Sequence, residues 1–334
     1  MKIALITGSY PPDTCGIGDY TAQLAIALRQ KGVVVEIICR TDWRLNNIGN
    51  IVKTIQSVNP DIVHIQYPTV GFGKKLTPQL LSLIIPSVIT VHEVSEAHIL
   101  RKLSLYPFFL RSKQIVFTTA YEQRFAVQRA PWISRRCSVI PVGSSISTAT
   151  QNYVRNVNEI IYFGLFRPQK GLEDVFTLAS LIKQKNLKLQ VHMVGKPYPK
   201  DSPYFKDFYR RSEDLPIKWD MDLADDVAAD LLARSSIAYM PFPDGASGRR
   251  TSLLALLANG VATITTRGGH TPPSLEQAVL FSQSPEEALR LVEKIRADND
   301  LRKQLSDNGR TYANQFNWDT IAQKHIELYE RLLG

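Results

Sequence analysis

Short apolar runs alternate with amphipathic stretches along the chain. In the first half the apolar runs occupy residues 2–8, 33–39, 61–67, 87–93, 114–119 and 137–143, and each is rich in β-branched residues. Continuous runs of this kind are typical of strands that are buried on both faces, as in parallel sheets. Amphipathic stretches such as residues 19–32 lie between them. The pattern therefore predicts successive right-handed βαβ units.

The second half repeats this alternation without repeating the sequence. Its apolar runs are residues 159–164, 189–195, 217–222, 237–242 and 261–266, separated by helical stretches such as residues 224–235. Between the halves lies the polar stretch "SSISTATQNYVRNVNE", after which the strand pattern restarts at Ile160. A chain of 334 residues suits two domains of ordinary size. We therefore expect an α/β protein with two doubly wound parallel-sheet domains, residues 1–150 and 151–317.

Composition narrows the class of protein. A hydrophobic content of 44% and a charged content of 21% are those of a soluble globular protein and exclude disorder. The cysteines Cys15, Cys39 and Cys137 lack metal-ligand spacing, and a strand-like run begins at Lys2 where a signal peptide would start, so we expect a cytoplasmic protein. Apolar runs fall short of the roughly 20 residues of a membrane-spanning helix, so any membrane contact is expected to be peripheral.

The net charge of +9 belongs mostly to the first half. Residues 1–147 hold 16 Lys and Arg against 8 Asp and Glu, whereas the remainder holds 24 against 23. A basic first half favours an acidic partner, such as anionic lipid head groups, a phosphorylated substrate or nucleic acid. The basic helix with interleaved stacking aromatics that would favour nucleic acid is not evident, so no nucleic-acid partner is expected.

In open α/β sheets, ligands bind beyond the carboxyl ends of the strands, so the residues just past each strand are the informative ones. After the first strand, Gly16 and Gly18 in "GSYPPDTCGIGDY" allow close backbone approach before a helix that is expected to begin near Asp19. These glycines make either a tight turn or a ligand loop. The loop lacks the third glycine of a dinucleotide fingerprint, which disfavours a nicotinamide cofactor.

A histidine follows the fourth apolar run directly. His92 in "ITVHEVSEAH" can exchange hydrogen bonds with a sugar hydroxyl, or it can serve a purely structural role. His64 lies inside its strand and is interpreted as a hydrogen-bonded core histidine. Glu93, Glu96 and His98 near His92 resemble a metal site only superficially, because no partnering cluster appears elsewhere, and no metal is expected.

Two basic clusters in the second half precede helices. Arg167 and Lys170 follow the strand ending "YFGLF", and the segment "DGASGRRTSLLALLANG" places Arg249 and Arg250 where a helix dipole already presents positive charge. Cations and backbone amides at helix entrances suit a diphosphate, and both clusters can face one anion. The expected donor-binding residues are Gly16, Gly18, Arg167, Lys170, Gly195, Asp244, Ser247, Arg249, Arg250, Thr251 and Ser252.

The order of these motifs resembles the retaining GT-B glycosyltransferases of family 4. The resemblance rests on the N-terminal glycine loop, "TVHE", "VIPVGSSI", "FGLFRPQKG", the segment from Gly245 to Gly260 and the ending "FNWDTIAQKHIELYERLL", and it covers nearly the whole chain. It implies two Rossmann-like domains that face across a cleft. It further implies an acceptor-binding first domain, a second domain that binds the nucleotide sugar, and a last helix, residues 318–334, that returns to the first domain.

The resemblance also implies roles for particular residues. His92 matches the histidine that contacts the transferred sugar, and Arg167 and Lys170 match the basic pair on the donor diphosphate, so these three are the expected catalytic residues. The family arginine more often sits at the position of Leu165. The usual pattern has two glutamates eight positions apart, which this chain replaces with Ser247 and Ala255. Asp244 is close enough in sequence to replace the first glutamate.

The expected reaction is transfer of a hexose from a nucleotide sugar, with retention, to a glycan or lipid-linked glycan in polysaccharide or envelope-glycan biosynthesis. A UDP-hexose is favoured, and neither a cofactor nor a metal is expected, because cations neutralise the leaving group. Asp19 and Glu93 are the nearest acidic residues, but neither is assigned as a base. The alternative is a non-catalytic GT-B protein that binds a nucleotide sugar or glycan, which explains the missing glutamates equally well.

One segment of the basic half suggests a membrane contact. "ILRKLSLYPFFLRSKQ" mixes Arg101, Lys102, Arg111 and Lys113 with apolar and aromatic residues, as interfacial segments do. "FAVQRAPWISRR", with Trp132, gives a similar signal. The segment is either a core helix with solvated basic ends or a peripheral contact with the inner face of the cell membrane. The membrane alternative favours a lipid-linked acceptor.

Overall fold

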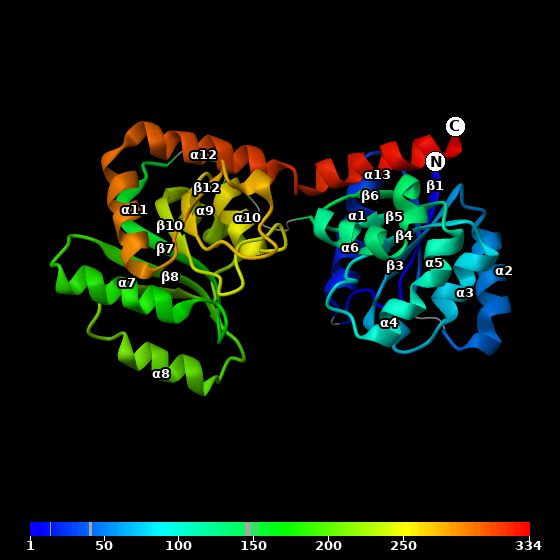
Figure 1. Cartoon of the computed structure of the whole chain (residues 1–334), viewed down its shortest axis with the longest axis horizontal. Helices are drawn as coiled ribbons and strands as arrows, with labels where there is room; N and C mark the ends of the chain where they lie inside the picture. Colours follow the sequence, from blue (N-terminus) through cyan, green and yellow to red (C-terminus); the bar gives the residue numbers. More distant parts are fainter. Residues whose placement is uncertain (14, 40–41, 144–147, 150, 152) are drawn as a thin grey trace. The chain divides into compact units, whose positions relative to one another are not determined.

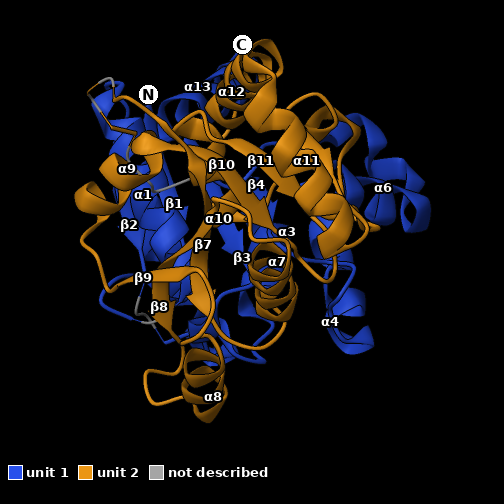
Figure 2. Cartoon of the chain, turned by 90° about the vertical axis from the view of Figure 1, so that its left-hand side faces the viewer, with its two compact units in different colours: residues 1–143, 317–334 blue, residues 144–316 orange. Residues whose placement is uncertain are grey.

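A computed structural model of the chain describes residues 1–334 except 14, 40–41, 144–147, 150 and 152 (Figure 1). The chain divides into two compact units, which Figure 2 shows in blue and orange. Unit 1 comprises Met1–Gly143 and Asn317–Gly334, and unit 2 comprises Ser144–Phe316. Residue 150, at which the sequence places the domain boundary, lies outside the described residues.

Unit 1 contains a parallel sheet in the order β2-β1-β3-β4-β5-β6 (Figure 1). Its strands are β1 (Lys2–Ile6), β2 (Val34–Ile38), β3 (Ile62–Tyr67), β4 (Ser87–Val91), β5 (Gln114–Phe117) and β6 (Cys137–Val139). Its helices are α1 (Gly16–Gln30), α2 (Ile48–Val58), α3 (Thr77–Ile84), α4 (Ile99–Ser104), α5 (Tyr106–Arg111), α6 (Ala120–Arg129), α13 (Trp318–Leu333) and the 3₁₀ helices η1 (Leu45–Asn47), η2 (Val70–Phe72) and η3 (Pro131–Arg136). Each strand falls within one of the predicted apolar runs.

The two faces of this sheet are covered by different helices. Because side chains alternate along a strand, Ile3 and Leu5 face a core with α1 and α13, whereas Ala4 and Ile6 face a core with α2, α3 and α5. Both cores are apolar, which explains why the strands read as unbroken hydrophobic runs. The last helix of the chain, α13, packs beside α1 (Figure 1). The C-terminal residues therefore complete the core of unit 1.

Unit 2 contains a second parallel sheet, in the order β12-β11-β10-β7-β8-β9. Its strands are β7 (Asn156–Phe166), β8 (Gln190–Pro197), β9 (Ile217–Met221), β10 (Ser235–Met240), β11 (Ala262–Thr265) and β12 (Val279–Phe281). Its helices are α7 (Leu172–Gln184), α8 (Pro203–Arg211), α9 (Asp225–Arg234), α10 (Thr251–Ala258), α11 (Pro285–Ala297), α12 (Asn299–Asn314) and the 3₁₀ helix η4 (Pro273–Leu275). The prediction of two doubly wound parallel sheets is confirmed.

The structure differs from the predicted elements in three places. Helix α1 begins at Gly16, three residues before Asp19, because Cys15 is extended and both glycines enter the first turn. The edge strand β12 was not predicted, since only three residues form it. Residues 99–111 form two short helices, α4 and α5, and α4 buries none of its residues.

Candidate functional site

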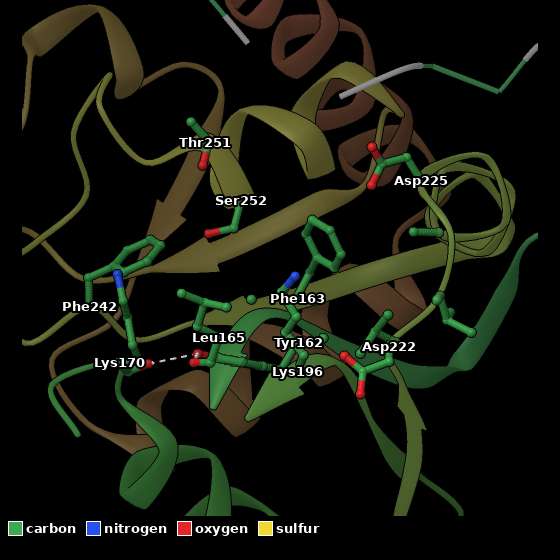
Figure 3. Close-up of a pocket in the computed structure, with 15 residues that line it drawn as sticks. Tyr162, Phe163, Leu165, Lys170, Lys196, Asp222, Asp225, Phe242, Thr251 and Ser252 are labelled. Carbon is green, nitrogen blue, oxygen red and sulfur yellow. Dashed lines mark hydrogen bonds between the residues drawn. The ribbon is translucent and has the colours of Figure 1, made fainter. Parts of the chain in front are cut away.

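The strand order of unit 2 reverses at β7, which lies between β10 and β8. Such a reversal opens a crevice beyond the carboxyl ends of the strands. A pocket of about 290 Å³ lies there (Figure 3). The lining comes from the ends of β7 and β8, from the segments after β9 and β10, and from the first turns of α9 and α10: Tyr162, Phe163, Gly164, Leu165, Lys170, Val194, Gly195, Lys196, Asp222, Leu223, Asp225, Ala228, Phe242, Thr251 and Ser252.

Two glycines let β7 and β8 approach closely at the floor of this pocket. Gly164 and Gly195 are paired in register, and a Cβ at Gly195 would lie 1.8 Å from the carbonyl oxygen of Gly164. Gly195 also has φ of +151°, which side chains other than glycine rarely adopt. The carbonyl oxygen of Gly164 occupies the place that a side chain at Gly195 would need, so only glycine fits there. Gly195, which the sequence predicts as a donor-binding residue, lines the pocket. Its lack of a side chain is required by the packing of β7 against β8.

One end of the pocket is cationic. Lys170 lines it, and the backbone carbonyl of Lys170 accepts a hydrogen bond from the Tyr162 hydroxyl at 3.1 Å (Figure 3). Partial burial lowers the pKa of Lys170, and the nearby charges of Arg250 and Arg167 lower it further, while Asp244 opposes them. The two basic clusters that are separated in the sequence thus act on one another in space. An anion at this end would relieve the repulsion among the three cations.

Arg250 is held in place from two sides. Its guanidinium forms an ion pair with Asp244 and lies over the Phe242 ring, 4.8 Å from the ring centroid. Its Nε is buried and has no hydrogen-bond partner among the residues that the structure describes. Its backbone N–H donates to the carbonyl of Ser247 at 3.0 Å, which turns the chain into α10. Arg250 lies outside the pocket lining, next to Thr251, and the exposed Arg249 and Arg167 lie outside it as well.

The entrance of α10 adds the partial positive charge of a helix N-terminus. Thr251 and Ser252 form the first turn and line the pocket. Helix N-termini leave backbone N–H groups without intrahelical partners and attract anions. The residue before the helix, Arg250, makes no side-chain cap with this turn. The cationic end therefore combines side-chain and backbone donors.

The opposite end of the pocket is acidic. Asp222 and Asp225 lie across the pocket from Lys170 and Phe242 (Figure 3), and Lys196 lies near Asp222. Asp222, Asp225, Lys196 and Phe242 were not predicted as site residues. Asp222 and Phe242 fall inside the predicted apolar runs 217–222 and 237–242, whereas β9 ends at Met221 and β10 at Met240, so both residues lie beyond their strands only in the structure.

The resemblance places the two family glutamates at Ser247 and Ala255, neither of which is acidic. Ser247 is partly exposed, outside the pocket lining, and Ala255 is fully buried in the apolar core of unit 2. Asp244 is the acidic side chain of this segment, and Arg250 neutralises it.

The remaining predicted residues lie in unit 1. His92 follows β4 and is partly exposed, with its Nε2 2.9 Å from Oε1 of Gln66 and its ring edge-on to Tyr20 at 4.8 Å between centroids. Its backbone is also fixed, because the N–H donates to Tyr67 and the carbonyl accepts from the Thr118 hydroxyl. His64 is buried and hydrogen-bonded, as expected from the sequence.

Gly16 and Gly18 open helix α1. A Cβ at Gly18 would lie 2.9 Å from the carbonyl oxygen of Ser9, whereas a Cβ at Gly16 would meet nothing within 4 Å. Gly18 is therefore required for packing, and only Gly16 leaves its surroundings open. Asp19 and Glu93 are both exposed.

Residues around His92 do not form a metal site in the structure. His98 caps α4 by accepting a hydrogen bond from the amide of Leu100. Within the described part of the chain, no group of three or more His, Cys, Asp or Glu side chains could hold a metal ion.

Two family models match adjacent stretches of the chain. The model described as glycosyltransferase family 4 matches residues 40–148, and the model described as glycosyl transferases group 1 matches residues 149–312. No curated protein matches the sequence.

Solved structures with the same fold superimpose on nearly the whole length of this chain. A glycosyltransferase from Rickettsia africae superimposes with a TM-score of 0.73 at 16% identity, covering 99% of this chain and 98% of that chain. HepE from Anabaena, in complex with UDP and glucose, superimposes with a TM-score of 0.66 at 15% identity, covering 99% of this chain and 100% of that chain. WaaG, involved in lipopolysaccharide biosynthesis, superimposes with a TM-score of 0.60 at 16% identity, covering 98% of this chain and 99% of that chain. These likenesses show the GT-B fold. The two family models together match residues 40–312, and on that ground the chain belongs to the glycosyltransferases that they describe.

Proposed function

We propose that the protein transfers a hexose from a nucleotide sugar, with UDP-hexose favoured, to a glycan or lipid-linked glycan with retention of configuration. The observation that carries this proposal is the polarity of the pocket in unit 2. Cations and the N-terminus of α10 lie at one end, and Asp222 and Asp225 lie at the other. A nucleoside diphosphate sugar has matching chemistry, since its diphosphate is anionic and its ribose and base carry hydrogen-bond donors.

In this proposal Lys170, Arg167 and Arg250 bind the diphosphate together with the backbone amides of Thr251 and Ser252. As the bond to the sugar breaks, negative charge develops on the diphosphate, and these preorganised donors stabilise it without a metal or other cofactor. Asp222 or Asp225 accepts hydrogen bonds from the ribose or base, and Asp244 accepts them from the sugar. The donor preference takes support from Anabaena HepE, whose structures contain UDP and glucose or UDP-glucose.

Retention follows, in this proposal, from attack by the acceptor hydroxyl on the face from which the phosphate leaves. No carboxylate of the pocket is assigned as a nucleophile, so the protein contributes positioning and charge stabilisation. Unit 1 binds the acceptor, with Gly16 and Gly18 at its helix entrance, and His92 hydrogen-bonds the transferred sugar. The involvement of WaaG in lipopolysaccharide biosynthesis supports a role in polysaccharide or envelope-glycan assembly.

The proposed location is the cytoplasmic face of the membrane, by peripheral contact. Ile99, Leu100, Leu103, Tyr106, Leu110 and Trp132 are all exposed on α4, α5 and η3. The rings of Tyr106 and Trp132 lie 6.2 Å apart, so α5 and η3 share one surface. Exposed Arg101, Arg111 and Arg135 flank it, as anionic lipid would require. None of the described helices is long and apolar enough to cross a membrane.

Turnover of a donor panel tests the function. The protein would be incubated with UDP-, GDP- and ADP-hexoses and lipid-linked glycans, and products would be followed by mass spectrometry. We expect a glycoside from one UDP-hexose, with the donor's anomeric configuration by NMR. Nucleotide-sugar binding without transfer would instead indicate the non-catalytic alternative, and an inverted product would contradict retention.

A further inference from the structure

A row of polar side chains crosses the otherwise apolar sheet of unit 1 and ends at His92. His64 and Gln66 alternate along β3, and Thr90 on β4 is the register partner of Gln66. His64, Gln66 and Thr90 are completely buried, whereas His92 at the strand end is partly exposed. The row lies on the face that α1 and α13 cover, because His64 pairs in register with Leu5, which packs in that core. Buried polar groups need partners, and these side chains provide them for one another.

The hydrogen bonds of His64 fix which of its ring nitrogens carries the proton. Burial lowers the pKa of His64 well below its ordinary value, so the ring is neutral and has one donor and one acceptor. The Gln66 amide nitrogen, which can only donate, lies 3.4 Å from Nε2 of His64, and the Thr90 hydroxyl lies 2.7 Å from the same atom. Nε2 therefore accepts. Nδ1 keeps the proton and donates to the Tyr329 hydroxyl at 2.6 Å.

The orientation of the Gln66 amide then determines the state of His92. With its nitrogen turned toward His64, Gln66 presents its carbonyl oxygen to Nε2 of His92, 2.9 Å away. A carbonyl oxygen can only accept, so Nε2 of His92 must carry a proton. The Tyr20 ring packs edge-on against the imidazole and limits its rotation, and Tyr20 in turn contacts Trp318 at the start of α13, 5.3 Å between centroids. Both the proton and the ring plane are thus set by buried neighbours.

We infer that Gln66 is a positioning residue that holds His92 in its Nε2-protonated form, and that the C-terminal helix α13 maintains this arrangement through Tyr329 and Trp318. The inference deepens the proposed function and rests on it for the role of His92 toward the sugar. If this row of side chains served only to satisfy buried polar groups, it would not need to end at the carboxyl end of a strand, where ligands bind in open α/β sheets. The α13 residues lie more than 200 positions from His92 in the sequence, yet they complete the core beside it.

The protonation state of His92 can be measured without a substrate. Nitrogen-15 NMR of the imidazole distinguishes the two neutral forms, and we expect the parent protein to show the proton on Nε2 of His92. Gln66→Leu removes the acceptor for that proton while Thr90 still serves His64, so a mixture of the two forms is expected. Tyr329→Phe removes the acceptor for Nδ1–H of His64, and a partial shift in the same direction is expected.

Gln66→Glu keeps an acceptor oxygen but adds negative charge beside His92. A nearby carboxylate favours the imidazolium, so the pKa of His92 should rise by about one unit in this variant and should not rise in Gln66→Leu.

With UDP-glucose as donor, kcat should fall about tenfold in Gln66→Leu while KM for the donor changes little, as when an outer hydrogen-bond partner of a functional histidine is removed. The optimum of the pH profile should move upward in Gln66→Glu.

His325→Asn is the matched control. His325 is buried on α13, with its ring centroid 5.6 Å from that of His64, and its Nδ1 hydrogen-bonds to the carbonyl of Ile321. This variant should leave the form of His92 and the pH profile unchanged. The inference is overturned if folded Gln66→Leu and Gln66→Glu both retain the parental form and pKa of His92. If the parent does not turn over UDP-glucose, that part of the proposed function fails, while the NMR result still decides the role of Gln66.

Discussion

Arg250, which directly precedes the pocket-lining Thr251, forms an ion pair with Asp244. The pair joins the residue before α10 to the segment after β10, and it places a negative charge beside one of the two arginines that precede this helix N-terminus. Asp244 balances the positive charge of Arg250, but its carboxylate also competes with any phosphate for the Arg250 guanidinium.

This competition predicts opposite effects of Asp244→Asn on two ligands. Affinity for UDP should increase a few-fold, because Arg250 and Lys170 lose a competing carboxylate. The extra affinity that a hexose adds to UDP should decrease, since a charged hydrogen bond contributes about 1.5–3 kcal/mol. Calorimetric titration with UDP and UDP-glucose measures both, with the exposed Asp214→Asn as control. Equal weakening of both ligands would show that Asp244 merely holds Arg250 in place.

Gly195→Ala should destroy the pocket floor. The new Cβ would overlap the carbonyl oxygen of Gly164, and the positive φ adds backbone strain. We expect a loss of about 2–5 kcal/mol in the free energy of unfolding of unit 2, together with loss of UDP binding. Gly269→Ala is the control, because a Cβ there would meet nothing within 4 Å. Equal stability of the two variants by denaturant unfolding would refute the close approach of β7 and β8.

Acid should destabilise unit 1 through its buried histidines. Burial lowers the pKa of His325 to about 4 and that of His64 well below its ordinary value. Because the unfolded chain binds these protons near pH 6.5, it holds more protons than the folded chain between about pH 6.5 and 4. The free energy of unfolding therefore falls as the pH decreases through this window, by about 3 kcal/mol for His325 alone.

Denaturant unfolding at pH 7.5, 6 and 5 measures this dependence. His325→Asn should flatten it, since the substitution removes one titrating group. His270→Asn, at an exposed position of unit 2, should leave the slope unchanged. A parental slope in His325→Asn would rule out His325 as a source of the acid sensitivity.

The exposed apolar surface of α4 and η3 predicts binding to anionic vesicles. Leu100→Ser combined with Trp132→Ser should reduce sedimentation with vesicles of phosphatidylglycerol and phosphatidylcholine at least tenfold, because two large exposed apolar side chains are lost. Ile26→Ser removes an apolar residue of α1 that is about as exposed as Trp132, and it serves as the control. If both variants bind as the parent does, the membrane proposal is wrong.

Much of the fold could be predicted because it depends on local pattern. The apolar runs that contain β1 and β3 are continuous, so they predict parallel strands buried on both faces, and the structure confirms this. The strand β12 was missed because three residues carry too little pattern. The early start of α1 was missed because Gly16 and Gly18 are poor helix formers, and tertiary packing of Gly18 against Ser9 outweighs that preference.

The site was only partly predictable for a different reason. Lys170 and Arg250 could be selected because each precedes a helix. Their mutual repulsion, and the ion pair with Asp244, depend on where β7 and β10 bring them. The row of hydrogen-bonded side chains from His64 through Gln66 to His92 also includes Tyr329, which lies near the C-terminus. No local pattern specifies such a contact.

The central claim is that Lys170 lies at the cationic end of a nucleotide-sugar site, and titration of UDP into the parent protein and into Lys170→Ala tests it most directly. We expect the parent to bind UDP and Lys170→Ala to bind it about 10–100-fold more weakly, because one charged hydrogen-bond donor is lost. Lys206→Ala, an exposed lysine on α8, should bind as the parent does. Equal UDP affinity of the parent and Lys170→Ala would contradict the claim.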